Sequence, residues 1–560
     1  MRVAVAQFAT SSNTQENLAT CIRMIKEAAK CKPAIIVLPE YCNTQADQKN
    51  HQQAWDEALN LNGEFLQKIA TLAKLHHCNI VLNVTLRRDL VRNEVNPLIK
   101  SNISITTCTF AETGELIHQA DKQTLQAHES EFFINTKTVD SLFTSSLGKL
   151  SILTGTEITS YKNAREQSRQ GAKLLCNLQS TKSQIQNSIY SSAWAHDNNV
   201  FIAKASKISD CGSVKSKAIN NEDSSQIVSL NGKILATLAN DKEGVIFADI
   251  DMDKAGIEKY QRPDGTNFTS QHRPELYQQL VLTSKIPKSE TLKSKIPETV
   301  NVALFATYKS NEQAIEDVCY YIENNLSDII QLPELFFLSD KTIANNAIQR
   351  VELEALCQIM ITKVSAVLRP FQYVCTSLVI NGSHQAVLIN ENGIFAIQQQ
   401  LHFCNRYQWT SLGNNLNIIV LPLEQGFINI AMLTADDANI PELSNIAALN
   451  KVNALLIPFD IQTSSEVNFG LLTRAAENQI CIVASSREKS FSEEQANNDI
   501  EKINPGNIKK IKPQKSTGLV VDIVNGNTNN LDGKLKIKQQ HGKITKALIH
   551  PRETIQGIYT

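Results

Sequence analysis

The sequence has no excess of charge of either sign and no long uninterrupted run of apolar residues. Its 560 residues include 55 Lys and Arg against 56 Asp and Glu, which gives a formal net charge of −1. A balance this close gives no reason to expect a nucleic acid or an anionic membrane surface as a partner. No apolar run reaches the length that spans a bilayer. We therefore expect a globular chain without nucleic-acid or membrane partners.

Paired cysteine motifs are also missing. The 12 cysteines are scattered, without a CxxC pair and without the Cys/His spacing of zinc ligands. This pattern argues against a disulfide framework and a zinc site, and we expect no metal and no cofactor. Residues 1–8 alternate like a strand and lack the apolar core and cleavage site of a signal peptide. Buried, reduced thiols and a cytoplasmic location are the expectation.

What the sequence does contain is an internal repeat. Residues 35–42 read IIVLPEYC and residues 329–336 read IIQLPELF. Upstream, VAQFAT at 5–10 matches VALFAT at 302–307; downstream, AHDNNVFIA at 195–203 matches AAENQICIV at 475–483. The offset between the copies drifts slowly, as loops of different length would cause. We predict two tandem domains, 1–282 and 299–560, joined by a Lys-, Ser- and Pro-rich linker at 283–298.

Short β-branched runs alternate with longer amphipathic segments in the first domain, which predicts a mixed sheet covered by helices. Helices are expected over 14–29, 63–75, 162–170 and 183–197. Strands are expected over 34–38, 79–84, 102–110, 150–154, 173–176, 200–205, 227–230, 233–238 and 244–249. The Lys-rich stretch 488–515 is expected to leave the second domain, either as a solvated loop or as a docking loop.

Each copy of the repeat ends in Leu-Pro-Glu and so delivers Glu40 or Glu334 at the end of an apolar strand. A buried carboxylate is costly unless it is paired or used. The first domain also carries Lys122, with Glu129 seven residues later. Gly155 stands where a predicted strand meets the next helix.

These segments resemble the nitrilase, or carbon-nitrogen hydrolase, superfamily over nearly the whole first domain. The resemblance rests on the strand ending in Glu40, on Lys122-x-x-Leu with Glu129, on the elbow at Gly155 and on the Gly-Ala pair at 171–172. It implies two tandem α-β-β-α sandwiches that pair as an intramolecular pseudo-dimer, and larger homo-oligomers or filaments are compatible with it.

The resemblance also implies a chemistry. In that family a Cys attacks an amide or nitrile carbon, and a first Glu exchanges its proton as general base and acid. A Lys stabilises the oxyanion, and a second Glu positions the Lys. Carried over, these roles fall on Glu40, Lys122 and Glu129, which we call the residual triad. The nucleophile position falls on Gly155, which has no side chain.

The second domain matches the same pattern at fewer positions. Glu334 takes the place of the first Glu. Gln398, three residues before Leu401, is predicted at the Lys position, and Asn405 at the position of the second Glu. Ala435 is predicted at the nucleophile position, so this domain keeps one group of four.

Three functions stay open from the sequence. The first is a pseudoenzyme that binds a small amide-, acid- or amine-like ligand or a protein partner. The second is an active C–N hydrolase that uses the residual triad with water, Thr154, Thr156 or Cys42 as the nucleophile. The third is a structural assembly module in which the triad only helps to specify the fold. Cys404, close to His402, is expected to be a packing residue.

Overall fold

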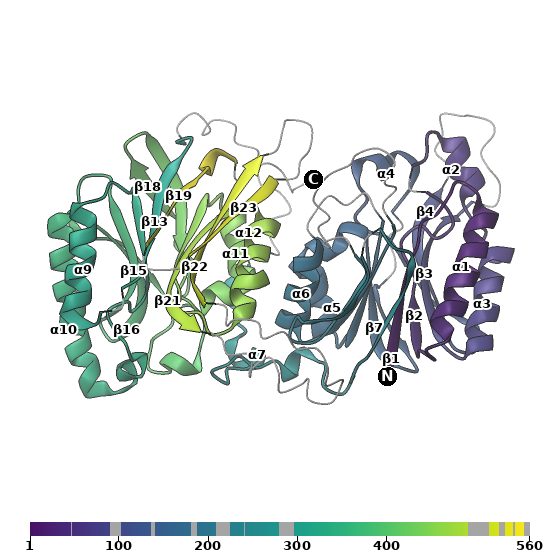
Figure 1. Ribbon diagram of the computed structural model, residues 1–560, viewed down its shortest axis with the longest axis horizontal. Helices are drawn as coiled ribbons and strands as arrows, with labels where there is room; N and C mark the ends of the chain where they lie inside the picture. Colours follow the sequence, from purple (N-terminus) through teal and green to yellow (C-terminus); the bar gives the residue numbers. More distant parts are fainter. Residues whose placement is uncertain are drawn as a thin grey trace. The chain divides into compact units, whose positions relative to one another are not determined.

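A computed structural model of the chain forms two compact units, Met1–Tyr260 and Gln261–Thr560, which we call unit 1 and unit 2 (Figure 1). It describes residues 1–45, 47–89, 102–135, 140–180, 187–208, 224–239, 241–278, 280, 296–307, 309–490, 515–525, 533–540 and 544–553. Most of the predicted linker 283–298 and of the Lys-rich stretch 488–515 lies outside these residues.

Two six-stranded sheets form the described part of unit 1. The first has the order β12 (Gly244–Asp249), β1 (Arg2–Gln7), β2 (Ile35–Val37), β3 (Asn79–Arg87), β4 (Ile103–Phe110) and β5 (Leu116–Asp121). The second has the order β11 (Ile234–Thr237), β10 (Gln226–Val228), β9 (Phe201–Ser206), β8 (Leu174–Gln179), β7 (Gly148–Thr154) and β6 (Leu142–Ser145). Strands β1–β3 are parallel, as are β7–β9, so the residues after β2 and after β7 lie at carboxyl edges.

Helices cover the outer face of each sheet of unit 1, and an apolar layer fills the space between the sheets. Helices α1 (Thr14–Ala29) and α3 (Glu64–His76) pack on the first sheet, and α5 (Tyr161–Arg169) and α6 (Asn187–Asn198) on the second (Figure 1). The shorter helices α2 (His51–Glu57) and α4 (Ala127–Phe132) lie in connections. The inner layer includes Val5, Val37, Ile152, Cys176 and Ala203. The predicted α-β-β-α sandwich is therefore confirmed for unit 1.

Local sequence explains why α1 forms where the pattern predicted it. The side chain of Asn13 accepts hydrogen bonds from the backbone N–H groups of Gln15 and Glu16, which caps the first turn. Buried residues then recur at helical spacing and face the first sheet, at Leu18, Cys21, Ile25 and Ala28.

Unit 2 repeats the strand order of unit 1. Its first sheet has the order β24 (Ile544–Ile549), β13 (Val300–Phe305), β14 (Ile329–Glu334), β15 (Tyr373–Ile380), β16 (Ser383–Asn390) and β17 (Gly393–Gln399). Its second has the order β18 (Ile419–Leu423), β19 (Gly426–Met432), β20 (Ala454–Pro458), β21 (Cys481–Ser490), β22 (Lys515–Asn525) and β23 (Gly533–Gln540). Two sheets with matching order are the structural counterpart of the sequence repeat.

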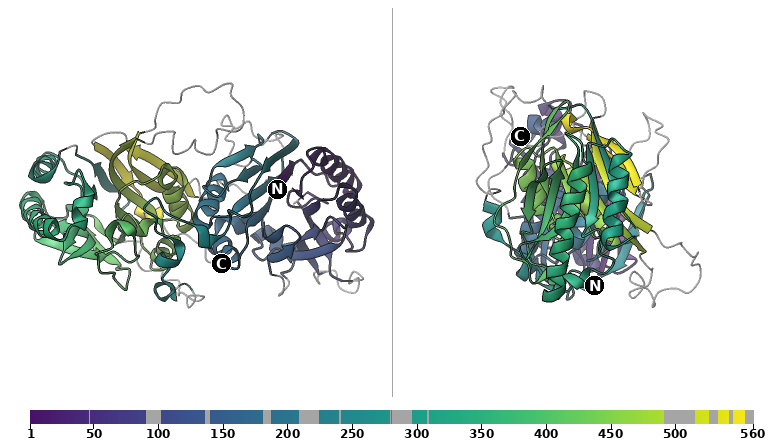
Figure 2. Two further views of the ribbon diagram at one scale, coloured as in Figure 1. Left: turned by 90° about the horizontal axis from the view of Figure 1, so that it is seen from below. Right: turned by 90° about the vertical axis from the view of Figure 1, so that its left-hand side faces the viewer.

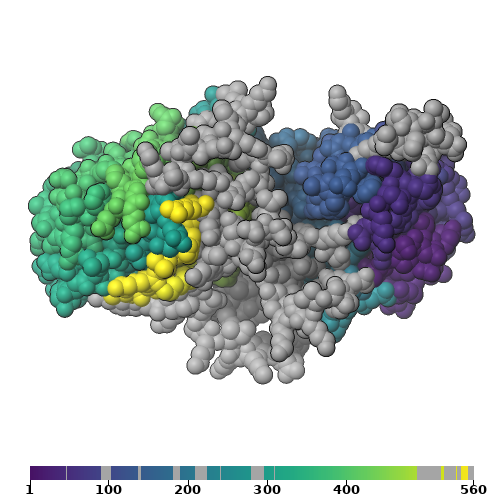
Figure 3. All heavy atoms as spheres, turned by 90° about the horizontal axis from the view of Figure 1, so that it is seen from above, coloured from purple at the N-terminus to yellow at the C-terminus, as the bar shows by residue number. Residues whose placement is uncertain are grey.

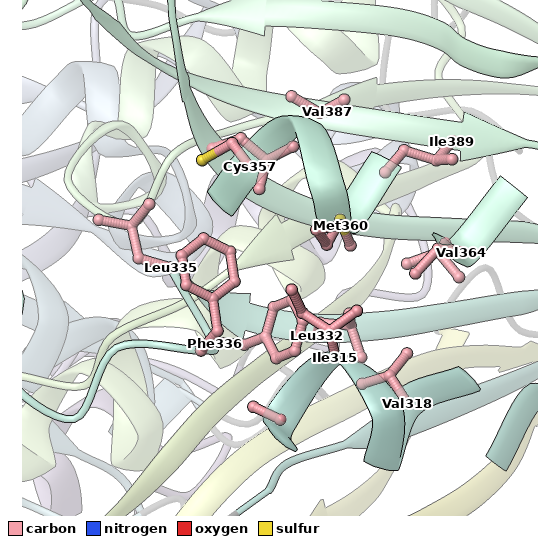
Figure 4. Packing of buried hydrophobic residues seen from close by; sticks show 14 of the residues in the cluster. Ile315, Val318, Leu332, Leu335, Phe336, Cys357, Met360, Val364, Val387 and Ile389 are labelled. Carbon is pink, nitrogen blue, oxygen red and sulfur yellow. The ribbon is translucent and has the colours of Figure 1, made fainter. Parts of the chain in front are cut away.

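Helices also cover both sheets of unit 2. Helices α9 (Asn311–Glu323) and α10 (Ala347–Val367) lie side by side on the first sheet, as the end-on view of Figure 2 shows. Their apolar residues interlock with those of β14 and β16 (Figure 4), including Ile315, Leu332, Met360, Val364 and Val387. Helices α11 (Pro441–Leu449) and α12 (Leu471–Asn478) contact each other, and α12 packs on strands β21 and β22 of the second sheet.

The first and last strands of each unit are neighbours in one sheet. Strand β1 pairs with β12, and β13 pairs with β24, both antiparallel over six residue pairs. In Figure 3 the yellow atoms of the late strands lie against teal and green atoms of unit 2. The ends of each unit are thereby joined through backbone hydrogen bonds.

The segment from 261 to 277, which the sequence assigned to the first domain, is part of unit 2. It contains the short helix α7 (Phe268–Gln271). Arg273 donates hydrogen bonds to the carbonyl oxygens of Leu401 (2.6 Å) and Gly413 (2.7 Å). The Tyr277 hydroxyl lies 2.6 Å from His402 Nε2.

Among the described residues, no helix combines the length and the apolar character that crossing a membrane would require. The eleven cysteines of this part of the chain are free thiols.

Candidate functional site

The fold brings the residual triad together at the carboxyl edge of the first sheet of unit 1. Glu40 follows β2, Lys122 follows β5, and Glu129 lies on α4. The Lys122 ammonium donates hydrogen bonds to Glu40 Oε1 at 2.8 Å and to Glu129 Oε1 at 2.7 Å. All three side chains are buried. The ammonium is therefore held between two carboxylates out of contact with solvent.

The remaining carboxylate oxygens of the triad also have partners. The Ser180 backbone N–H donates to Glu40 Oε2 at 3.0 Å, and the Gln126 backbone N–H donates to Glu129 Oε2 at 2.8 Å. The Tyr41 hydroxyl donates to Glu129 Oε1 at 2.6 Å. Because each oxygen accepts at least one hydrogen bond, the cluster satisfies its own carboxylates.

Burial and charge act in opposite directions on the triad. Burial raises the pKa of Glu40, and the nearby Lys122 ammonium only partly offsets this effect. Burial disfavours the charged form of Lys122, but the Glu40 and Glu129 carboxylates outweigh it and hold the pKa of that ammonium above its ordinary value. Burial also raises the pKa of Tyr41, which keeps its hydroxyl protonated as a donor.

Two residues with left-handed backbone shape this site. Tyr41, directly after Glu40, has φ 55°, and Gly155, directly after β7, has φ 58°. A left-handed residue between a strand and a helix is the geometry of a nucleophile elbow. A Cβ atom on Gly155 would lie 2.6 Å from Lys122 Nζ and 3.2 Å from Glu40 Oε1. The Lys122 ammonium therefore occupies the space that a side chain at 155 would enter.

Replacing Gly155 with Ala is expected to lower the free energy of unfolding by about 2–4 kcal/mol. The loss combines the strain of an L-residue at positive φ with displacement of the Lys122 ammonium from its carboxylates. Gly382 is the matched control, because it has φ 70° and open space around its Cα. Urea unfolding of both variants measures the difference. Equal losses for Gly155→Ala and Gly382→Ala would mean that contact with Lys122 has no energetic weight.

A further carboxylate, Glu157, ties the elbow to the loop that carries Lys122. Glu157 accepts hydrogen bonds from the backbone N–H groups of Gln123 at 2.8 Å, Thr124 at 3.4 Å and Thr154 at 2.8 Å. Burial raises the pKa of this carboxyl, and the three N–H donors oppose that shift. Glu157 therefore links Gln123, which follows Lys122, to Thr154, which precedes Gly155.

Asp437 makes the equivalent contacts in unit 2. It accepts hydrogen bonds from the backbone N–H groups of Leu401 at 2.8 Å and His402 at 2.9 Å, and from the Thr434 hydroxyl at 2.9 Å. Glu157 lies two residues after Gly155, and Asp437 lies two residues after Ala435. Ala435 therefore precedes its carboxylate by the same spacing as Gly155, but it does not share the positive φ of Gly155.

The same contacts place Gln400, and not Gln398, at the position of Lys122. Leu401, whose N–H binds Asp437, directly follows Gln400. In the same way Gln123, whose N–H binds Glu157, directly follows Lys122. Gln398 lies within β17 and donates to the carbonyl oxygens of its neighbour and of Asn415. The sequence placement was two residues off because Leu401 was matched to the Leu of Lys122-x-x-Leu.

Glu334 is brought to the carboxyl end of β14, but its partners differ from those of Glu40. Arg406 donates to both of its oxygens, at 2.9 and 3.1 Å, and the Tyr407 hydroxyl donates at 3.0 Å. Lys341 Nζ lies 3.5 Å away and His384 Nε2 3.8 Å away. The Arg406 and Lys341 cations therefore balance the Glu334 carboxylate, for which the sequence predicts no cationic partner.

Asn405 does not join this group. Its backbone N–H donates to Asp264 Oδ2 and Thr266 Oγ1, both at 2.9 Å, and its side-chain amide donates to the Asp264 carbonyl. The prediction that Asn405 replaces the second Glu beside Glu334 is therefore wrong.

One group in unit 2 has the residue types of a metal site. Asp264, Cys404 and Asp436 bring ligand atoms within 4.8 Å of one another. However, the Cys404 sulfur already accepts a hydrogen bond from the Gln400 side-chain amide at 3.3 Å. Asp436 already pairs with the guanidinium groups of Arg262 and Arg406. This group therefore suits a protein ion pair better than a metal ion.

Sequence reasoning missed Tyr41, Lys341, Arg406, Asp436 and Asp460 as parts of these clusters. They come from separate loops and have no short motif in common. The available signal was the cost of an unpaired buried carboxylate, which required some cation near Glu334 once the Lys position had become neutral.

The sandwich and the buried cluster of unit 1 define an α-β-β-α protein with a carboxylate–ammonium–carboxylate centre. The sequence profile of the carbon-nitrogen hydrolase family matches residues 2–259. This match confirms the resemblance of the first domain to the carbon-nitrogen hydrolase family. No curated protein matches the chain.

Solved structures of an amidase from Nesterenkonia sp. AN1 are among those similar to this chain. One variant of it, described as from the nitrilase superfamily, is 18% identical, covers 45% of this chain and 90% of its own, and has a TM-score of 0.36. The NitN amidase itself is 17% identical, with 45% and 93% coverage and a TM-score of 0.37. A third structure, with the same values, shows acrylamide added to that amidase's active-site cysteine.

Proposed function

We propose that the protein is a nitrilase-superfamily pseudoenzyme, which does not hydrolyse amides or nitriles through a cysteine and acts by binding. The observation that carries this proposal is the 2.6 Å between Lys122 Nζ and the place of a Cβ on Gly155. Covalent catalysis in this fold needs a nucleophile in front of the Glu and Lys. At Gly155 there is no side chain, and the space is taken by the ammonium.

Two of the side chains that could replace a cysteine, Cys42 and Thr154, are engaged elsewhere. The Cys42 thiol donates to the Pro39 carbonyl oxygen at 3.2 Å and packs in the apolar layer beneath α1 and α3. The Thr154 hydroxyl lies 3.2 Å from the Thr107 hydroxyl in the buried interior. Cys404 belongs to the apolar cluster under α9 and α10. These contacts favour packing roles, as expected from the sequence for both cysteines.

The retained charges suggest the class of ligand. The Lys122 ammonium can donate to a carbonyl or carboxylate oxygen, and the Glu40 and Glu129 carboxylates can accept from an amide or amine N–H. We therefore propose a small amide-, acid- or amine-like ligand, or a protein partner, bound without turnover. The free thiols support a reducing, cytoplasmic setting as part of this proposal. Pairing of the two units within a chain and larger homo-oligomers stay predictions, and light scattering after size-exclusion chromatography checks the latter.

We expect purified protein to release no ammonia above background from a panel of aliphatic and aromatic amides and nitriles. The missing nucleophile is the physical reason. Glu40→Gln is the control variant, because it removes the only group placed as a general base. Identical traces for the two proteins support the proposal. Release that the substitution abolishes would overturn it in favour of hydrolysis by activated water.

Ligand binding is tested separately by thermal shift with amides, carboxylic acids and amines. A ligand of the folded state raises the melting temperature by mass action. The rise should disappear in Glu129→Gln, which keeps the side-chain shape but changes the charge of the cluster. A panel without any shift, in a protein that still assembles, would favour the structural module over the binding protein.

A further inference from the structure

Three carboxylates of unit 2 converge on one guanidinium group. Arg406 uses one terminal nitrogen for Glu334 Oε2 (2.9 Å) and Asp460 Oδ2 (2.7 Å). Its other terminal nitrogen binds Glu334 Oε1 (3.1 Å) and Asp436 Oδ2 (2.7 Å). The three carboxylates are buried, as is most of the Arg406 side chain. Four oxygens therefore surround two nitrogens of one planar cation.

This arrangement fits a guanidinium better than an ammonium. A guanidinium is planar and presents its N–H donors as a rigid fork, so it can bind a carboxylate through two parallel hydrogen bonds while its edges reach others. An ammonium is a compact point charge without that fork. Lys341 contacts the same cluster as such a point charge, with Nζ 2.7 Å from Asp460 Oδ1.

Other contacts hold each carboxylate in place independently of Arg406. The Arg262 guanidinium lies 3.0 Å from the second oxygen of Asp436. Lys341 and the Gln462 side-chain amide both bind Asp460. The Tyr407 hydroxyl binds Glu334, as described above. The oxygens that receive the guanidinium are therefore positioned in advance.

The cluster of three carboxylates also has a defined place in the fold. Glu334 ends β14 as Glu40 follows β2, and Asp436 directly follows Ala435 in the chain. Arg406 contributes one positive charge and four hydrogen bonds to the carboxylates of Glu334, Asp436 and Asp460. Its removal makes the charge of this buried cluster more negative by one, which favours entry of a cation.

We infer that unit 2 contains a guanidinium-binding pocket that the chain keeps closed with its own Arg406 side chain. The intact protein therefore does not admit a small guanidinium ion at this place. Removal of the Arg406 side chain should turn the cluster into a site for a free guanidinium or a short alkylguanidinium ion.

The experiment uses full-length Arg406→Gly and millimolar ethylguanidinium chloride, far below denaturing concentrations. We expect a lowered melting temperature for the variant and a saturable recovery of several degrees as ethylguanidinium is added, because the ligand binds only the folded state. Wild type and Arg406→Lys should show no recovery, since their pockets are filled. Tetramethylammonium chloride at the same concentration controls for charge and ionic strength.

Specificity is tested by adding Asp460→Asn to Arg406→Gly. The ethylguanidinium concentration that gives half of the recovery in melting temperature should then rise at least tenfold. Should Arg406→Gly fail to fold, refolding with and without ethylguanidinium replaces the melting assay, and a higher yield with the ligand is expected. Equal responses to ethylguanidinium and tetramethylammonium would overturn the inference. So would an unchanged recovery in the Asp460→Asn background, or no effect of the ligand on either melting or refolding.

Discussion

Lys122→Met is expected to lower the free energy of unfolding at neutral pH by about 3–5 kcal/mol. The substitution removes the ammonium that donates to both Glu40 and Glu129, and Met fills a similar volume without a charge. Two carboxylates then remain buried a short distance apart with no cation between them. Urea unfolding at neutral pH measures the loss. Lys30→Met is the control, because Lys30 is exposed, and its substitution should cost less than about 0.5 kcal/mol.

The loss should depend on pH in a defined direction. Burial already raises the pKa of Glu40, and removing Lys122 removes the largest effect that opposes the rise. A carboxyl whose folded-state pKa is raised contributes stability below its unfolded pKa and loses it as pH increases. The loss in free energy of unfolding caused by Lys122→Met should therefore be smaller at about pH 5 than at about pH 7. A deficit that stays constant over this window would contradict the assignment of the ammonium as the balancing charge.

Asp437→Ala and Glu157→Ala are expected to cost similar amounts, each about 3 kcal/mol or more. Each removes a carboxylate that accepts two or more backbone N–H groups, at distances from 2.8 to 3.4 Å. The hydrogen bonds from Leu401, His402 and Thr154 are buried, so these N–H groups would lose their acceptor away from solvent. This pair tests whether the two units use the same support at these positions.

Urea unfolding, followed by fluorescence and by circular dichroism, measures both variants. Glu424→Ala provides the control, since that carboxylate is exposed in a turn of unit 2. A negligible loss for Asp437→Ala, beside a large one for Glu157→Ala, would show that the matching contacts do not carry matching energies. The two substitutions lie in different units, so their effects should add in the double variant.

The regular elements could be read from the sequence because their patterns are local. The helix predicted over 14–29 is α1, and the strand predicted over 244–249 is β12. Helical spacing of apolar residues and runs of β-branched residues are set within a few turns or a few residues. The Leu-Pro-Glu motif, being one such run followed by a carboxylate, also located Glu40 and Glu334 correctly at strand ends.

The partners of Glu334 in unit 2 could not be predicted from the sequence in the same way. Arg406 approaches Glu334 from a loop more than seventy residues later in the chain. The placement of Gln398 relied on counting from Leu401, and counting fails when the loop after a strand changes length. The backbone N–H contacts of Asp437, which reveal the right register, depend on tertiary structure and leave no spacing signature.

The pairing of first and last strands in each unit has a consequence for synthesis on the ribosome. Strand β1 must wait about 240 residues for β12, and β13 waits about as long for β24. During this time one edge of each nascent first sheet is unpaired and open to other strands. A translational pause or a truncation before β12 or β24 would therefore leave an unpaired edge strand that can pair with another chain. Chaperone dependence during translation should consequently be greatest just before each unit receives its closing strand.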